Sequence, residues 1–271
     1  MRCSHNLLTL IHNTLSGRRV YMLYGYVWLL GATLTVYGCR TDTAHTLDGY
    51  DRCAGADTLK QAVFCSYEEF EVFRQNYSCY KELLAISFYV DPVLMPENIR
   101  TDTVLHFCLN RGIKIVSLYS DTLYPTQAHT PDTSIESLAL SFMHYVPDSS
   151  YGLAHFRQLR EILLSTSGDI PASIVLPDSL EELFVLGRIK VWPKSWFTLA
   201  YIRQIVMIDP ELEHIPPAIC SLSSLNQLDI RYTRLGELTR LKDAQALQEV
   251  QDLRQCLPRT VILIHDIPMP H

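Results

Sequence analysis

Two sets of residues recur in step along most of this 271-residue chain, and their spacing constrains the fold more than any other feature. The first set is an aliphatic residue that opens a stretch of the form Leu-x-x-Leu-x-Leu. The second is a proline that follows each of the first six openings by 12 to 14 residues. Two spacings held in phase over seven stretches predict a repeated structural unit. The openings are Leu83, Ile113, Ile135, Leu159, Leu180, Ile202 and Leu225, and the prolines are Pro96, Pro125, Pro147, Pro171, Pro193 and Pro216.

Each stretch is typical of a short strand, in which side chains alternate between two faces. The fourth and sixth positions therefore share one face, and all fourteen residues at these positions are apolar. One strand cannot bury such a face alone, but stacked strands bury it as a continuous core. Proline fixes φ and disfavours a preceding helix, so a turn should follow each strand. The expected inward residues are Ile86, Phe88, Val116, Leu118, Leu138, Leu140, Ile162, Leu164, Leu183, Val185, Ile205, Met207, Leu228 and Ile230.

The pattern Ile-Pro-x-x-Ile-x-x-Leu-x-x-Leu, as in residues 215–225, closely resembles the leucine-rich repeats of bacterial and plant-like proteins. The resemblance covers roughly residues 57–265. It implies an α/β solenoid, a right-handed superhelix of about seven repeats over residues 83–242. The ninth position departs from the family, where Asn or Cys bonds backbone along the stack, so we expect a less regular solenoid. That position holds Asp91, Asp121, Met143, Ser167, Arg188, Pro210 and Thr233.

The open ends of a solenoid need covers, and both ends carry helix signals. Residues 57–82 are the expected N-terminal cap, because Ser66-x-x-Glu69 matches a capping box before a short helix over residues 67–75. Its apolar side holds Phe70 and Phe73, and Asp57 should cap a preceding turn with Leu59, Ala62 and Val63. Residues 243–271 are the expected C-terminal cap and tail, a helix ended by Pro258 and then a strand over residues 261–264. The helix should bury Leu247, Val250, Leu253 and Leu257.

Residues 20–38 form a stretch of 19 residues without a charge, preceded by Arg18 and Arg19. A basic flank, an apolar stretch and a small residue before the break are typical of an export signal. The end of this stretch resembles the lipobox of bacterial lipoproteins. The resemblance implies a signal peptide over residues 1–38 and a diacylglycerol group on Cys39.

Arg40 follows the cysteine where an aspartate would imply retention at the inner membrane, so the resemblance favours the outer membrane. Polar residues then make residues 39–56 a tether. Two alternatives stay open for the N-terminus. It is long enough for an uncleaved single-pass signal anchor, since about 20 apolar residues span a bilayer. It could also be a buried helix of an intracellular scaffold.

Charge content narrows the class of partner, and cysteine content bears on disulfides and metal sites. Residues 1–39 hold three basic side chains and no acidic ones, so the rest of the chain carries 20 basic against 29 acidic, a net charge near −9. Such a surface repels nucleic acid. Exported cysteines can pair, and Cys53, Cys65 and Cys79 lie where a disulfide could staple the open end. Free buried thiols are the alternative, and the scattered cysteines do not predict a zinc site.

The third, fifth and seventh positions of each stretch face away from the core, and extended solenoids usually bind partners there. In the middle stretches these positions combine an apolar patch with a partly acidic edge that includes Glu161, Glu182, Asp229 and Arg231. Aromatic residues continue the face toward the N-terminus. An apolar patch with a polar rim is typical of a protein-binding surface. The predicted partner-binding residues are Leu163, Phe184, Leu186, Val206, Ile208, Tyr89 and Tyr119.

These patterns predict an exported, lipid-anchored and monomeric scaffold that binds another protein without catalysis, cofactor or metal. The phosphate-loop, nucleophile-elbow and zinc-helix motifs are absent from the sequence. Two alternatives remain. The chain could be an enzyme with a site among Asp91, His106 and Asp121, at the edge of the early stretches. It could instead be an intracellular leucine-rich repeat scaffold.

Overall fold

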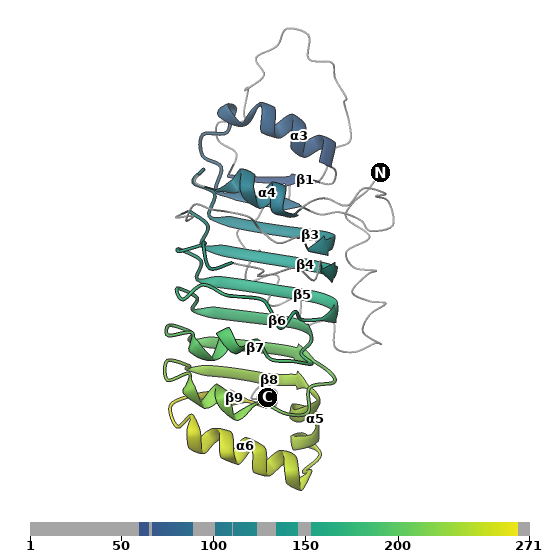
Figure 1. Ribbon diagram of the computed structural model, residues 1–271, viewed down its shortest axis with the longest axis vertical. Helices are drawn as coiled ribbons and strands as arrows, with labels where there is room; N and C mark the ends of the chain where they lie inside the picture. Colours follow the sequence, from purple (N-terminus) through teal and green to yellow (C-terminus); the bar gives the residue numbers. More distant parts are fainter. Residues whose placement is uncertain are drawn as a thin grey trace, which may run out of the picture. The chain divides into compact units, whose positions relative to one another are not determined.

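The computed structural model describes residues 60–64, 67–88, 101–109, 111–123, 134–145 and 153–264. All of them belong to one structural unit, residues 55–271. Its nine described strands form one parallel sheet in which each strand pairs with the next along the chain (Figure 1). With few helices, this arrangement is compatible with the predicted α/β solenoid-like fold. The strands are β1 (Gln61–Phe64), β2 (Ala85–Phe88), β3 (Ile115–Leu123), β4 (Ser137–Tyr145), β5 (Glu161–Asp169), β6 (Glu182–Arg188), β7 (Gln204–Asp209), β8 (Gln227–Thr233) and β9 (Val261–Leu263).

The helices are short and lie beside the sheet or at its two ends (Figure 1). The α-helices are α3 (Tyr67–Gln75), α4 (Thr101–Cys108), α5 (Arg234–Arg240) and α6 (Ala244–Cys256), and the 3-10 turns are η2 (Tyr77–Cys79), η3 (Lys194–Thr198) and η4 (Pro217–Ser221).

The pairing of the strands confirms the register predicted from the seven openings. The third residue of every stretch stands in one row across β2 to β8. Since strand side chains alternate, this one row decides which residues share a face. The row consists of Ala85, Ile115, Ser137, Glu161, Glu182, Gln204 and Gln227.

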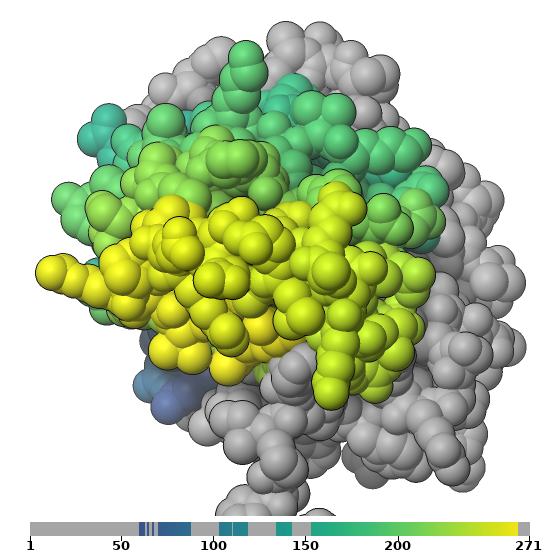
Figure 2. Space-filling view, turned by 90° about the horizontal axis from the view of Figure 1, so that it is seen from below, coloured from purple at the N-terminus to yellow at the C-terminus, as the bar shows by residue number. Residues whose placement is uncertain are grey.

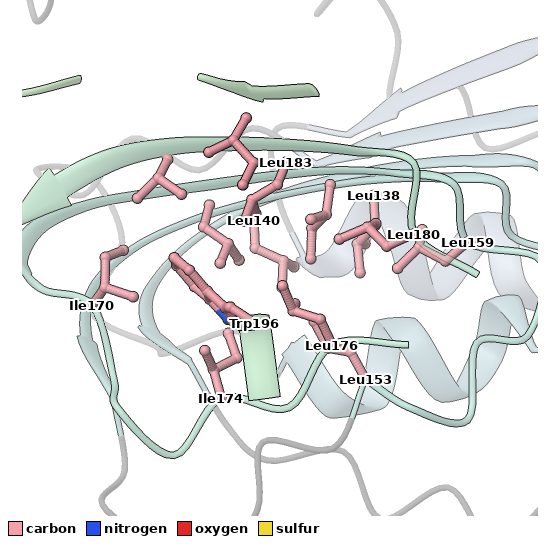
Figure 3. Packing of buried hydrophobic residues seen from close by; sticks show 14 of the residues in the cluster. Leu138, Leu140, Leu153, Leu159, Ile170, Ile174, Leu176, Leu180, Leu183 and Trp196 are labelled. Carbon is pink, nitrogen blue, oxygen red and sulfur yellow. The ribbon is translucent and has the colours of Figure 1, made fainter. Parts of the chain in front are cut away.

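The core lies on the predicted side of the sheet. Thirteen of the fourteen expected inward side chains are buried, none more than 4% exposed, and the Phe88 side chain lies outside the described part. The seven opening residues are buried as well. In the middle of the stack Leu138, Leu140 and Leu183 belong to the same core cluster as Trp196, which enters from η3 (Figure 3). Each buried side chain of this size contributes about 2 kcal/mol relative to an exposed one, so the stacked core stabilises the sheet.

The described prolines of the recurrent column begin turns, as predicted. In each turn the proline carbonyl accepts a hydrogen bond from an N–H three residues later, and that residue buries its side chain. The chain thereby reverses after the strand and returns an apolar anchor to the core. Pro96, Pro125 and Pro147 lie outside the described residues. The described pairs are Pro171 with Ile174 at 3.2 Å, Pro193 with Trp196 at 3.0 Å and Pro216 with Ile219 at 3.0 Å.

Asp209 partly replaces the missing asparagine ladder. It lies one position before the ninth and is 2% exposed. Its Oδ2 accepts the Ile189 N–H at 2.9 Å, and its Oδ1 accepts the Glu211 N–H at 2.9 Å. A buried carboxylate that accepts two backbone donors links the ends of two neighbouring strands. The pairing also shifts between β5 and β6 and between β7 and β8, which agrees with the expected irregularity.

At the N-terminal end, α3 has the predicted bounds and buries Phe70 and Phe73. The turn expected with Ala62 and Val63 is wrong, because both residues lie in β1. Ala62 pairs with Ile86, so main-chain bonding to β2 outweighs any local preference for a turn. Asp57 and Leu59 lie outside the described residues.

At the C-terminal end, α6 and β9 confirm the predicted helix and strand. Val250, Leu253 and Leu257 are buried as expected, but Leu247 is 44% exposed. Ala246 is buried in its place, one residue earlier on the same helix, and Asp243 caps the helix by accepting the N–H groups of residues 245 and 246. Figure 2 looks onto this end of the unit, where residues near the C-terminus form the near surface.

The short helix α5 was not predicted, and one glycine makes its position possible. Thr233 caps α5 by accepting the Gly236 N–H at 3.1 Å. A Cβ atom on Gly236 would lie 2.2 Å from the Ile230 carbonyl oxygen, so no other residue fits without a shift of the backbone. The helix therefore starts directly after β8, inside the segment assigned to the last repeat.

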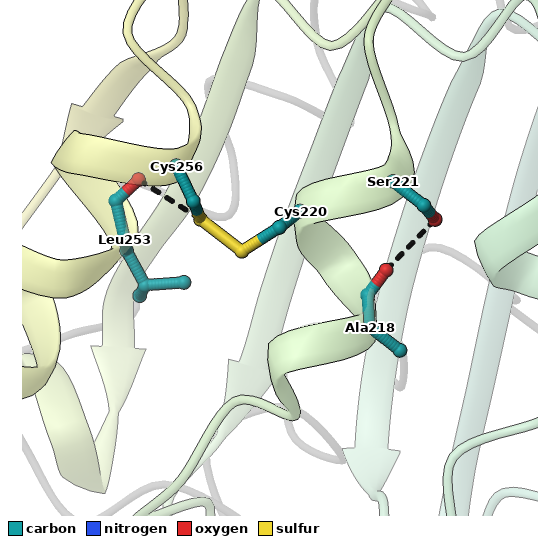
Figure 4. The surroundings of a disulfide bond; sticks show 5 residues. All are labelled: Ala218, Cys220, Ser221, Leu253 and Cys256. Atoms are coloured by element: carbon teal, nitrogen blue, oxygen red, sulfur yellow. Dashed lines mark hydrogen bonds between the residues drawn. A yellow bond between two sulfur atoms is a disulfide. The ribbon is translucent and has the colours of Figure 1, made fainter.

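A disulfide joins Cys220, in η4, to Cys256, at the end of α6, with 5.4 Å between their Cα atoms (Figure 4). The sequence left cysteine pairing open and pointed to the N-terminal end as the place where a disulfide could form. Cys79, from that predicted cluster, is also disulfide-bonded, while Cys53 and Cys65 lie outside the described residues.

The N-terminal predictions fall outside the part of the chain that the structure describes: the signal peptide of residues 1–38, Cys39 and the tether. Among the residues that are described, no helix combines the length and apolar content needed to cross a bilayer.

Candidate binding face

The outward face is defined here by the third, fifth and seventh positions of β5, β6 and β7. The parallel pairing brings its five predicted apolar residues together in two rows. Leu163, Phe184 and Val206 stand side by side at the fifth position, and Leu186 pairs with Ile208 at the seventh. Neighbouring strands lie about 4.8 Å apart. The five positions are therefore neighbours on one face of the sheet, as the predicted register requires.

These residues differ in how far they reach the surface. Leu163, Phe184, Leu186 and Ile208 are half-buried. Val206 is only 4% exposed, so its assignment as a partner-contacting residue is wrong. It stands between Phe184 and Asp229 in its row, and Asp229 is itself completely buried. The accessible part of the apolar surface thus excludes the β7 end of the fifth-position row.

The expected polar rim at β8 is instead an internal ion pair. Asp229 accepts the Arg231 Nε–H at 3.0 Å and the Nη2–H at 2.7 Å, each on a different carboxylate oxygen. The Arg231 side chain is only 15% exposed. The register shift also places Tyr232, rather than Arg231, beside Ile208. A paired buried carboxylate stabilises the local geometry without offering a charge to a ligand.

Two glutamates at the third position form the polar border of the outward face. Glu161 and Glu182 pair directly across β5 and β6, next to Leu163 and Phe184 along the strands. Burial raises the pKa of Glu161, and the Glu182 charge raises it further, while a hydrogen bond with Ser137 lowers it. Like charges directly opposite each other destabilise a sheet, so this pair does not itself stabilise the fold.

A column of alternating charges runs along the sheet one residue before the glutamates. Arg160 Nη1 and Arg203 Nη1 lie 3.4 and 3.2 Å from the two oxygens of Glu181. Lys114 and Glu136 pair at 2.8 Å in the same column. The arginines nearest the glutamate pair are thus already ion-paired. The alternation of sign after the five openings from Ile113 to Ile202 is visible in the sequence, but we did not predict the column.

The remaining predicted residues have different outcomes. Tyr89 lies outside the described residues, and Tyr119 stands at the seventh row of β3, with its side chain outside the described part. For the enzyme alternative, His106 is exposed on α4, while Asp91 and the Asp121 side chain are not described. Among described residues, no three His, Cys, Asp or Glu side chains are grouped to hold a metal ion.

Comparison of the chain with models of known protein families and with the sequences of curated proteins finds no match.

Proposed function

We propose that this chain is a leucine-rich repeat array, a right-handed superhelix of about seven repeats with a helix covering each end. Its resemblance to that family rests on the recurrent Leu and Pro positions. The pairing of all seven third-position residues in one row supports it. We infer further that the array binds another protein through its outward face and has no catalytic role.

The observation that carries this function is the continuity of the apolar surface. Leu163, Leu186 and Ile208 come from three strands, are half-buried and adjoin two carboxylates on the same face. Apolar patches with a polar border are the usual form of protein-binding surfaces. The net charge near −9 of residues 40–271 supports a protein partner over nucleic acid.

Site-specific photo-crosslinking in the producing cells tests the face. A photoreactive residue at position 186 or 208 should give a discrete crosslinked species that mass spectrometry identifies as the same protein. Val191 is the matched control position, since it is apolar and 62% exposed but lies after β6. Adding Leu163→Arg should remove the crosslink, because a charge there places a desolvation cost on the interface. Equal crosslinking from position 191 would contradict the assignment.

For location, we propose an exported lipoprotein of the outer membrane, anchored through Cys39. The Cys220–Cys256 disulfide supports export, because such bonds persist mainly in oxidising compartments. Each buried methylene of an acyl chain contributes about 0.8 kcal/mol, so two or three chains would hold the protein stably. The signal-anchored and intracellular forms are the competing proposals.

Mass spectrometry of the native N-terminus separates these forms. We expect a mature chain that begins at Cys39 and carries the added mass of two or three acyl chains. Cys39→Ser should leave the chain unacylated, while Cys53→Ser should not. A native protein that still begins at Met1 would exclude the lipoprotein.

A further inference from the structure

The border of the outward face has a charge imbalance that the fold itself does not resolve. Glu161 and Glu182 face each other across two strands, and no described basic side chain is ion-paired with either of them. Arg160 and Arg203, which precede Glu161 and Gln204 in sequence, are both ion-paired with Glu181 in the neighbouring column. The flanking members of the row are uncharged, with Ser137 on β4 and Gln204 on β7.

Apolar side chains continue directly from these carboxylates along each strand. On β6 the outward order is Glu182, Phe184 and Leu186, and on β7 it is Gln204, Val206 and Ile208. Outward residues of one strand are two apart, about 6.6 Å along the chain. A ligand that matches the face must therefore present a positive charge at one end and apolar groups beyond it, at comparable spacing.

We infer that the partner engages this face through a polypeptide segment that carries both a cationic and several apolar side chains. Its arginine or lysine lies between Glu161 and Glu182. Its apolar side chains lie on Leu163, Leu186 and Ile208. This inference rests on the proposed binding function and names the chemistry of the partner. A cation at that position removes the repulsion between the two carboxylates. A guanidinium suits the site better than an ammonium because its planar fork can donate to two carboxylates at once.

An extended segment has the same two-residue period as the face, so a simple peptide can serve as the probe. We choose a fluorescein-labelled peptide built from two copies of Ser-Arg-Ser-Leu-Ser-Leu, which places arginine and leucine on one side. Two companion peptides carry glutamate for arginine or serine for leucine. Fluorescence anisotropy with the full mature protein should show binding of the first peptide and at least roughly tenfold weaker binding of each companion.

The matching variant is Glu161→Gln with Glu182→Gln, which keeps the shape of both side chains and removes their charges. We expect its affinity for the arginine peptide to fall roughly tenfold. The control, Asp178→Asn with Glu213→Gln, makes the same change in net charge at two exposed positions in turns outside the sheet. It should bind like the parent. Equal weakening in both variants, or none in the first, would overturn the proposed site.

The pH dependence gives a second readout. A bound cation favours the ionised form of Glu161, so its pKa is lower in the complex than in the free protein, where burial and Glu182 raise it. The affinity for the arginine peptide should be highest above the pKa of Glu161 in the free protein. It should fall as the pH drops through that value toward the lower pKa of Glu161 in the complex. The doubly substituted variant should lack this dependence, since neither arginine nor glutamine titrates there. A parent curve as flat as that of the variant would contradict the inference.

The two proposals fail in different ways. If the peptide does not bind while crosslinks from positions 186 and 208 still capture one protein, the outward face binds a partner of another chemistry. If those crosslinks also fail, the outward face itself is not the binding surface.

Discussion

Replacing Cys220 and Cys256 with serine should lower the free energy of unfolding by about 4 kcal/mol, the cost expected for opening a loop of this length. The two residues are 36 apart in sequence, so the bond removes much of the freedom of the unfolded chain. Cys256 is exposed, and little packing is lost with its sulfur. The helix α6 should stay in place, because Glu249 still accepts the Ile215 N–H at 2.7 Å and bonds His214 at 2.8 Å. Urea unfolding of parent and variant under oxidising conditions measures the difference.

Reducing conditions supply the control for this prediction. In reductant the parent loses both the Cys220–Cys256 bond and the disulfide at Cys79. The variant loses only the disulfide at Cys79, so neither protein then has a cross-link that the other lacks. Parent and variant should then unfold at the same urea concentration. A difference that persists in reductant would mean that the serine side chains, and not the missing cross-link, lower the stability.

Trp196→Ala should also lower the free energy of unfolding by about 4 kcal/mol, because truncating a large buried aromatic leaves a cavity. Trp196 is 1% exposed and belongs to the same core cluster as Ile170, Ile174 and Leu176 (Figure 3). It also contacts Trp192 edge to face, with 6.0 Å between ring centroids. Its loss removes the anchor that ties η3 to the middle of the sheet. Thermal and urea unfolding both measure the effect.

Phe197 is the matched control, since it lies in the same turn but is only half-buried and stacks on Trp192 at 5.9 Å. Phe197→Ala should cost about 1.5 kcal/mol, roughly the value of the area that it removes from water. Equal losses at the two positions would show that η3 is held by its surface aromatics and not by the buried anchor.

Much of the fold could be predicted because its signals are local. The register followed from the spacing of Leu83 and its six counterparts, and strand alternation then assigned the inward residues, which are buried wherever they are described. The helix over residues 67–75 followed from its capping box, and the strand at residues 261–263 from its aliphatic run. The apolar outward rows followed from the same register.

Other features could not be predicted because they depend on contacts between distant residues. Val206 occupies an outward position like Leu163, yet its side chain is only 4% exposed. Asp229 looked like part of a polar rim, but Arg231 pairs with it internally. Asp209 took over part of the ladder because the strand before it ends where its carboxylate can accept the Ile189 N–H.

By itself, the sequence determined the register of the sheet, the identity of its core and which residues face away from that core. These properties follow from the two-residue alternation of strands and from the recurrence of the openings, both of which are linear patterns. The tertiary structure decided the pairing of Cys220 with Cys256, the burial of Val206 and the engagement of Arg160 and Arg203 with Glu181 in place of the Glu161–Glu182 pair. Each depends on which side chains from neighbouring turns reach one another, and a linear pattern does not contain that distance.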